Sequence, residues 1–153
     1  MIVRTIDELP LLEVRELMYK GEKKAVKGTK MRWLVSGKIG DEKYRKVIGV
    51  RYFEASPGAE IPMHEHLYQE IVIILTGKVK VITEDKIVRV RAGGKIEELN
   101  MKETVLKAGD LFYTYPGEPH AIINVGDETV KIDCIIDCSD LFVYYQMNFC
   151  NLP

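Results

Sequence analysis

The stretch from Gly58 to Gly77 constrains the structure of this chain more than any other segment. It carries His64, His66 and Glu70, and the remaining histidine, His120, lies far downstream. The chain has three histidines in all, so the usual scatter of surface and core histidines does not explain this placement. Because imidazole and carboxylate groups are common ligands of divalent metals, the sequence predicts a metal site built from two distant segments.

The geometry of this stretch favours strands over a helix. In a helix His66 and Glu70 would share a face, but His64 would lie off that face. Pro62 and the β-branched run at residues 71–74 also disfavour a helix. In a strand His64 and His66 point to the same side, yet a straight strand from His64 to Glu70 would span about 20 Å. The chain must therefore turn between His66 and Glu70.

Short β-rich segments separated by glycine and proline make up most of the chain from residue 31 onward. Residues 31–36 and 46–55 favour strands, and Ser56, Pro57 and Gly58 predict a turn that leads into the histidines. The length of 153 residues suits one domain. We therefore expect a single all-β domain over residues 31–153, including a C-terminal tail.

The two ends of the chain are less regular in sequence. Residues 1–30 predict an irregular N-terminal arm with one helical turn. Within this arm, the apolar residues Leu11, Val14, Leu17 and Met18 have the spacing of one face of a short helix. At the other end, residues 141–152 are too apolar for a disordered tail, so we expect them to pack on the domain or on a neighbouring subunit.

Residues 84–108 predict an insertion between the two histidine segments. Two β-rich runs at 87–91 and 95–99 flank Gly93 and Gly94, which is typical of a hairpin. We interpret it as a decorative hairpin inserted at an edge of the domain. An active-site lid is the less favoured alternative, because loops of this size vary at little thermodynamic cost.

The three cysteines, Cys134, Cys138 and Cys150, are odd in number and are expected to be thiols. On a straight strand Cys134 and Cys138 lie about 13 Å apart, whereas a disulfide needs Cα atoms within about 7 Å. Cys134 has the inward parity of its strand, which could place its thiol near the metal, either as a group that surrounds the ligands or as a thiolate tuned by the ion. The simpler interpretation, a small buried apolar residue, is favoured and the other stays open.

Charge and hydropathy exclude several partners. The net charge of −1 gives no electrostatic reason to expect nucleic acid or an anionic membrane. The start of the chain lacks the basic and apolar pattern of a secretory signal, and no apolar run approaches the roughly 20 residues that span a bilayer. The cytoplasm is the expected compartment.

Two motifs give the chain a family resemblance. The first motif is Gly58-x5-His64-x-His66-x3-Glu70-x6-Gly77. The second motif begins at Gly109 and continues with Pro116-Gly117-x2-His120-x3-Asn124. Together they resemble the two conserved motifs of the cupin superfamily, in particular its small single-domain members. The resemblance implies a double-stranded β-helix, or jelly-roll, barrel and often a homodimer. It also implies a metal ion bound by His64, His66, Glu70 and His120.

The expected ligand set limits the chemistry of the site. Three neutral imidazoles and one carboxylate leave a net charge of about +1 on a divalent ion, which favours an anionic oxygen donor. In octahedral Mn or Fe the set leaves two positions open, whereas in tetrahedral Zn it closes the coordination sphere. We favour Mn or Fe, and Ni, Cu and Zn stay open.

The leading hypothesis is a metal-dependent enzyme of the dioxygenase or lyase/decarboxylase type. Its substrate would be a small anionic or enolisable molecule, because two open positions accommodate a chelating ligand or a ligand and dioxygen. The alternative is a non-catalytic cupin that binds a metal or a small ligand. The sequence leaves open whether the protein is an enzyme, and it assigns no catalytic residue beyond the metal ligands.

Overall fold

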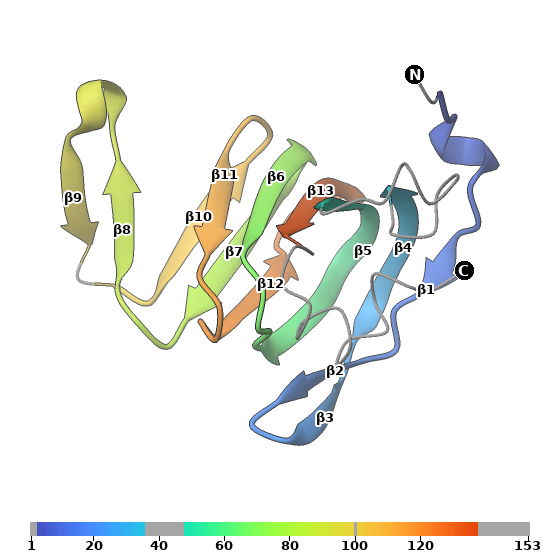
Figure 1. The fold of residues 1–153 in the computed structure, drawn as a ribbon, viewed down its shortest axis with the longest axis horizontal. Helices are drawn as coiled ribbons and strands as arrows, with labels where there is room; N and C mark the ends of the chain where they lie inside the picture. Colours follow the sequence, from blue (N-terminus) through green and yellow to red (C-terminus); the bar gives the residue numbers. More distant parts are fainter. Residues whose placement is uncertain (1–2, 36–47, 100, 138–153) are drawn as a thin grey trace.

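The structure is a computed structural model that describes residues 3–35, 48–99 and 101–137. Almost all regular elements in these ranges are strands (Figure 1), in keeping with their many β-branched and aromatic residues. The first elements are η1 (Ile6–Glu8), β1 (Leu12–Glu13), β2 (Glu16–Tyr19), β3 (Glu22–Ala25), β4 (Lys27–Val35), β5 (Ile48–His64), β6 (Glu70–Thr76) and β7 (Lys78–Thr83). The others are β8 (Ile87–Val90), η3 (Ala92–Gly94), β9 (Ile96–Leu99), β10 (Glu103–Lys107), β11 (Leu111–Thr114), β12 (His120–Asn124) and β13 (Val130–Asp137). The predicted all-β class is confirmed.

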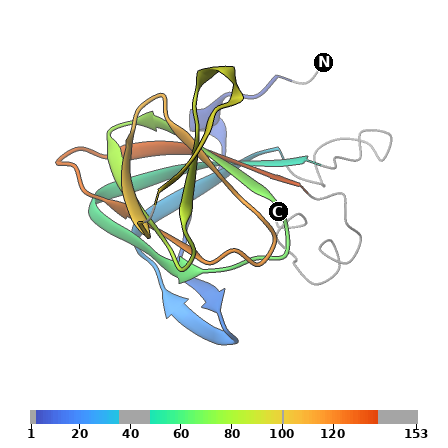
Figure 2. The same ribbon diagram turned by 90° about the vertical axis from the view of Figure 1, so that its left-hand side faces the viewer.

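One antiparallel sheet curls into a nearly closed barrel, seen from another side in Figure 2. Its strand order is β10-β7-β12-β5-β13-β6-β11, and β4 adds to β5 with β1 beyond it. The long strand β5 connects the two halves, because its first part pairs with β13 and its last part with β12. The turn predicted at Ser56, Pro57 and Gly58 is wrong: these residues lie within β5, where Gly58 has a φ of +72°.

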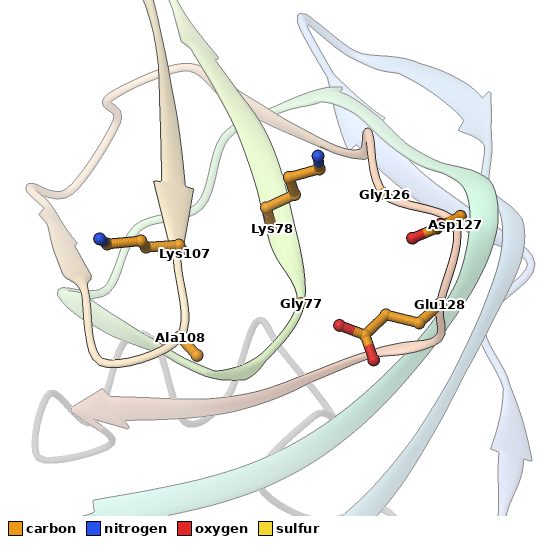
Figure 3. A pocket seen from close by; sticks show the side chains of 7 residues that line it. All are labelled: Gly77, Lys78, Lys107, Ala108, Gly126, Asp127 and Glu128. Atoms are coloured by element: carbon orange, nitrogen blue, oxygen red, sulfur yellow. The ribbon is translucent and has the colours of Figure 1, made fainter.

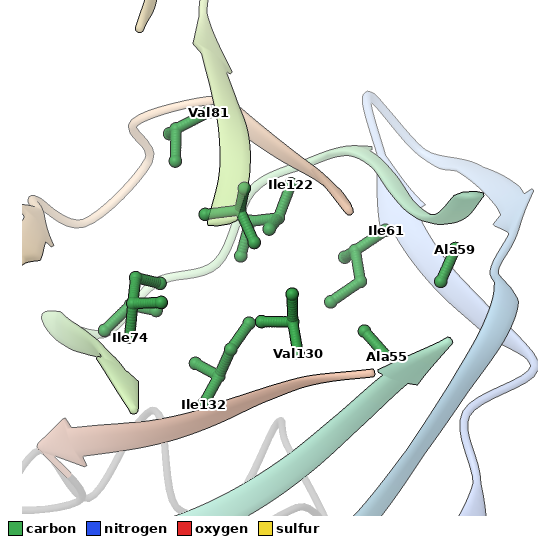
Figure 4. Packing of buried hydrophobic residues seen from close by; sticks show 10 residues of the cluster. Ala55, Ala59, Ile61, Ile74, Val81, Ile122, Val130 and Ile132 are labelled. Atoms are coloured by element: carbon green, nitrogen blue, oxygen red, sulfur yellow. The ribbon is translucent and has the colours of Figure 1, made fainter. Parts of the chain in front are cut away.

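The core fills the inside of the barrel. Strand β13 alternates buried and more exposed residues, so its inner side chains pack against those of β5 and β6. Ile132, for example, lies opposite Phe53 on one side and Ile74 on the other. Figure 4 shows the side chains of Ile74 and Ile132 gathered with other buried residues of this core. Each isoleucine buried in this way contributes about 1.5–3 kcal/mol to the free energy of unfolding.

Gly77, between β6 and β7, should not tolerate a side chain. Its φ is +71°, and a Cβ atom there would lie 2.7 Å from Val130 Cγ2. We expect Gly77→Ala to lower the free energy of unfolding by about 2–4 kcal/mol, through backbone strain and overpacking together. Gly58→Ala is the matched control in urea denaturation, since Gly58 has a φ of +72° with nothing within 4 Å of its added Cβ. Equal losses in both variants would contradict the packing argument.

The N-terminal segment contains more regular structure than its sequence indicates. The helical stripe expected at residues 11–18 is wrong, because β1 pairs with β4 and β2 pairs with β3 as a hairpin. Lys20 and Gly21 both have positive φ, as a tight hairpin turn requires. The single helical turn is η1. The division of the chain at residue 30 stays a prediction.

The insertion between the histidine segments contains the expected hairpin. Strands β8 and β9 form a separate two-stranded sheet that stands away from the barrel in Figure 1. Residues 103–107 instead form β10, which pairs with β7 in the barrel. Cys138, Cys150 and the tail at 141–152 lie outside the described residues. In the part of the chain that the structure describes, no helix has the length and hydropathy needed to cross a membrane.

Candidate metal centre

The barrel brings the predicted residues together. His64 ends β5, Glu70 begins β6 and His120 begins β12, where it lies opposite His64 in register. The chain bends at residues 67–68, as the argument from strand length predicted, and this returns Glu70 toward His66. One nitrogen or oxygen atom from each of the four residues lies within 4.8 Å of the others, and all four residues are buried.

The three imidazoles are held in the same tautomer. Each Nδ1 lies within hydrogen-bond distance of a backbone carbonyl, which can only accept a hydrogen bond. Each Nδ1 must therefore carry the proton, and each Nε2 is left with a lone pair, as in metal-binding histidines. The pairs are His64 Nδ1 with Pro62 O at 2.9 Å, His66 Nδ1 with Tyr68 O at 2.9 Å and His120 Nδ1 with Glu118 O at 3.0 Å.

The Nε2 lone pairs of His66 and His120 face the carboxylate of Glu70, and this arrangement of electron-rich atoms suits a bound cation. His66 Nε2 lies 2.9 Å and His120 Nε2 3.2 Å from Glu70 Oε2. His120 Nε2 is buried and has no hydrogen-bond partner. With the proton on Nδ1, neither neutral ring can donate to Glu70, so the facing atoms repel unless a positive charge lies between them. The residues present therefore fit a divalent metal ion.

Electrostatics keep the donor atoms in the forms that a metal requires. Burial and the neighbouring His120 lower the pKa of His64 to about 3, so this imidazole stays neutral. Burial alone would raise the pKa of Glu70, but the positive charge of Arg51 beside it outweighs this effect and lowers the pKa well below its usual value. Glu70 is therefore a carboxylate.

The metal-free protein should lose stability in acid because of His64. The folded state keeps this imidazole neutral down to about pH 3, whereas the unfolded chain takes up the proton below its usual pKa of 6.5. The free energy of unfolding should fall by about 1.4 kcal/mol per pH unit below pH 6.5, and Glu70 adds to the loss only below its own usual pKa of 4.5. Urea denaturation in EDTA between these two pH values measures the slope. His64→Gln should flatten it, and an equal slope in this variant would contradict the assignment.

Arg51 and Cys134 contact the other oxygen of Glu70. Arg51 Nη2 donates to Glu70 Oε1 at 2.7 Å and lies 2.8 Å from Cys134 Sγ, while the Cys134 thiol donates to the same carboxylate oxygen. Burial raises the pKa of Cys134 well above its usual value, so it is a thiol rather than a thiolate. Cys134 thus touches the candidate ligand Glu70 and lies outside the group of four donor residues.

Sequence reasoning did not single out Arg51 or Thr114. Arg51 shares its strand parity with the inward residues Phe53 and Ala55, which is the signal that could have found it. Thr114 lies opposite Glu70 in the β6–β11 ladder, and its buried hydroxyl has no hydrogen-bond partner. Tyr68 stacks on His66 with ring centroids 4.0 Å apart.

A surface depression lies at the end of β6 opposite to Glu70. It has a volume of about 360 Å³, and its walls carry both lysine and acidic side chains (Figure 3). Gly77 and Lys78 line it just after β6 ends, whereas Glu70 stands where β6 begins. The depression is thus separate from the histidine cluster.

Comparisons with known proteins agree with this architecture. Residues 94–137 match the cupin domain family, a segment that includes His120 but not the first histidine motif. Comparison with curated protein sequences gave no match.

Solved structures share the fold at low sequence identity. The polyketide cyclase RemF from Streptomyces resistomycificus is 21% identical with a TM-score of 0.62, over 96% of this chain and 94% of that chain. A predicted oxalate decarboxylase from Thermotoga maritima is 22% identical with a TM-score of 0.61, over 90% and 98%. An oxalate oxidase is 19% identical with a TM-score of 0.54, over 72% of this chain and 51% of its own. The matched segment and the shared jelly-roll barrel show that this chain has a cupin-like fold.

Proposed function

We propose that the protein binds a divalent metal ion through His64, His66, Glu70 and His120 and acts as a metal-dependent enzyme on a small anionic or enolisable molecule. The observation that carries the proposal is the convergence of these four buried donor residues within 4.8 Å. Three lone pairs and one carboxylate oxygen meet there, and no proton arrangement of neutral rings satisfies them.

Mn or Fe suits the proposed activity best, with Ni, Cu and Zn as alternatives. Held by His64, His66, Glu70 and His120, such an ion would supply Lewis-acid or redox chemistry to a bound small molecule. The chain's own residues hold the donors in one orientation, and the buried Tyr68 and the partly buried Phe112 add apolar surface that excludes water. The unpartnered Thr114 hydroxyl beside Glu70 would hydrogen-bond a polar group of the substrate.

The reaction type is proposed as dioxygenase or lyase/decarboxylase. Structurally similar proteins are named as an oxalate oxidase, a predicted oxalate decarboxylase and a polyketide cyclase. Oxalate is a small dianion, which suits the positive charge expected of a loaded site. A screen should therefore include short dicarboxylates and enolisable aromatic ketones.

The test has two stages. Metal analysis of protein purified without added metal should give about one Mn or Fe per chain, consistent with the one group of donor residues in the described ranges. The loaded protein is then assayed for oxygen uptake and for carbon dioxide release with these substrates. Turnover that persists after His64 and His120 are both replaced by alanine would contradict a metal-dependent reaction.

A non-catalytic metal-binding or small-ligand-binding protein is the second candidate. It is favoured by the two protic side chains that lie beside the candidate ligands: burial raises the pKa of both Cys134 and Tyr68 above their usual values, so neither gives up its proton readily. In that case the purified protein would hold a redox-active metal and bind small anions, yet turn over no compound in the screen.

We also propose a cytoplasmic homodimer whose partner is a small molecule rather than nucleic acid or a membrane. Exposed apolar side chains support self-association: Val90 and Ile96 on the β8–β9 hairpin are 68% and 67% exposed. Light scattering of the purified protein distinguishes a dimer from a monomer.

A further inference from the structure

Arg51 is an unusual residue for the interior of a barrel. It is only 8% exposed, on the inward side of β5, where it lies opposite Trp33 of β4 and Cys134 of β13. Burying a guanidinium is costly unless it is paired and hydrogen-bonded. Among the described residues, the carboxylate that it meets is Glu70.

The contacts divide the two oxygens of Glu70 between two sets of partners. Oε1 accepts from Arg51 Nη2 at 2.7 Å and from the Cys134 thiol. Oε2 faces His66 Nε2 at 2.9 Å and His120 Nε2 at 3.2 Å. With Oε1 held in this way, Glu70 can offer a metal only Oε2.

Arg51 is itself held in place by aromatic rings. Its guanidinium carbon lies 5.8 Å from the ring centroid of Trp33, 5.4 Å from that of Phe53 and 5.8 Å from that of Tyr68. Tyr68 also stacks on His66 and accepts the hydrogen bond from His66 Nδ1. One side chain therefore contacts both the guanidinium and a candidate metal ligand.

We propose that Arg51, assisted by Cys134, is a positioning residue that makes Glu70 a one-oxygen metal ligand through Oε2. The inference rests on the proposed metal site. Without the guanidinium, Glu70 would be free to rotate and to bind the ion through both oxygens, which would take up one of the two positions left for a substrate. Metal affinity and coordination geometry would both change.

The test compares Arg51→Met and Arg51→Lys with the wild-type protein, using Mn²⁺ and Co²⁺ as probes. We expect Arg51→Met to bind Mn²⁺ about 10–100-fold more weakly, the usual effect of removing a group that orients a metal ligand. The visible spectrum of the Co²⁺ form should also change. Arg51→Lys keeps a cation near Oε1 and should recover part of the affinity. A role in stability alone would not change the spectrum.

Arg32→Met is the matched control. Arg32 also pairs with a glutamate on a neighbouring strand, Glu54 of β5, and its side chain is 11% exposed. Neither residue belongs to the group of donor residues, so this variant should lose stability while its Mn²⁺ affinity and Co²⁺ spectrum stay as in the wild type.

The outcomes separate the two proposals. If the wild-type protein binds neither ion, the proposed metal site is wrong. If it binds both, but Arg51→Met has the affinity and spectrum of the wild type, only the positioning role is overturned. Should Arg51→Met fail to fold, Arg51→Lys and Cys134→Ala decide: a changed Co²⁺ spectrum in either supports the role, and unchanged spectra in both overturn it.

Discussion

Replacing His64 and His120 together with alanine will abolish the binding of Mn²⁺ and other divalent ions. The double variant keeps only His66 and Glu70 of the four donor residues. Changing residues that merely orient ligands already costs about 10–100-fold in affinity, so removing two donors should cost more than about 100-fold. Isothermal titration calorimetry with Mn²⁺, and metal analysis after dialysis, measure the loss.

Glu65→Ala provides the matched control for this loss. Glu65 lies between His64 and His66 in sequence, but its carboxylate accepts a hydrogen bond from the backbone of Lys20 and is not among the donor residues. The variant should bind Mn²⁺ with wild-type affinity. Undiminished binding in the double histidine variant would rule out this cluster as the metal site.

Ile132→Ala will lower the free energy of unfolding by about 2–5 kcal/mol. Ile132 is 1% exposed and packs inside the barrel between Phe53 and Ile74, so the shorter side chain leaves a cavity there. Domains of this size have only about 5–15 kcal/mol of stability, and the loss would be a large part of it. Urea denaturation of the two proteins measures the difference.

Ile135→Ala separates the effect of the cavity from that of the strand. Ile135 lies on the same strand with the opposite parity and is only partly buried. Because both variants exchange isoleucine for alanine in β13, the change in strand propensity is the same. The inward variant should lose clearly more stability, and equal losses would contradict the placement of the core.

The candidate site could be predicted from the sequence because the spacing of its donor residues restricts how the chain can fold around them. Donors that are incompatible with one helix face and too far apart on one strand must meet through a turn, and the structure has that turn at residues 67–68. Arg51 was missed because arginine side chains are usually exposed. Its position in β5, two residues before the inward-facing Phe53, was the one sign that it points inward, and the sequence does not show how β5 pairs with β13.

The other differences between the predicted and the observed strands arise where the backbone is locally irregular. Pro57 and Gly58 resemble a turn, but in the structure they allow β5 to bend from one half of the barrel to the other without ending. The β2–β3 hairpin turns at Lys20 and Gly21, and lysine is not among the residues that favour positive φ. The hairpin also contacts a distant segment, because Tyr19 and Lys20 both bond to Glu84, just after β7.

The place of Trp33 against Arg51 has a practical consequence. Trp33 is the one tryptophan of the sequence, and its buried indole nitrogen has no hydrogen-bond partner. All tryptophan fluorescence of this protein therefore originates beside the guanidinium that holds Glu70. Quenching by a paramagnetic ion, or a shift in emission when Arg51 is changed, would follow events at the metal centre in solution without any added label.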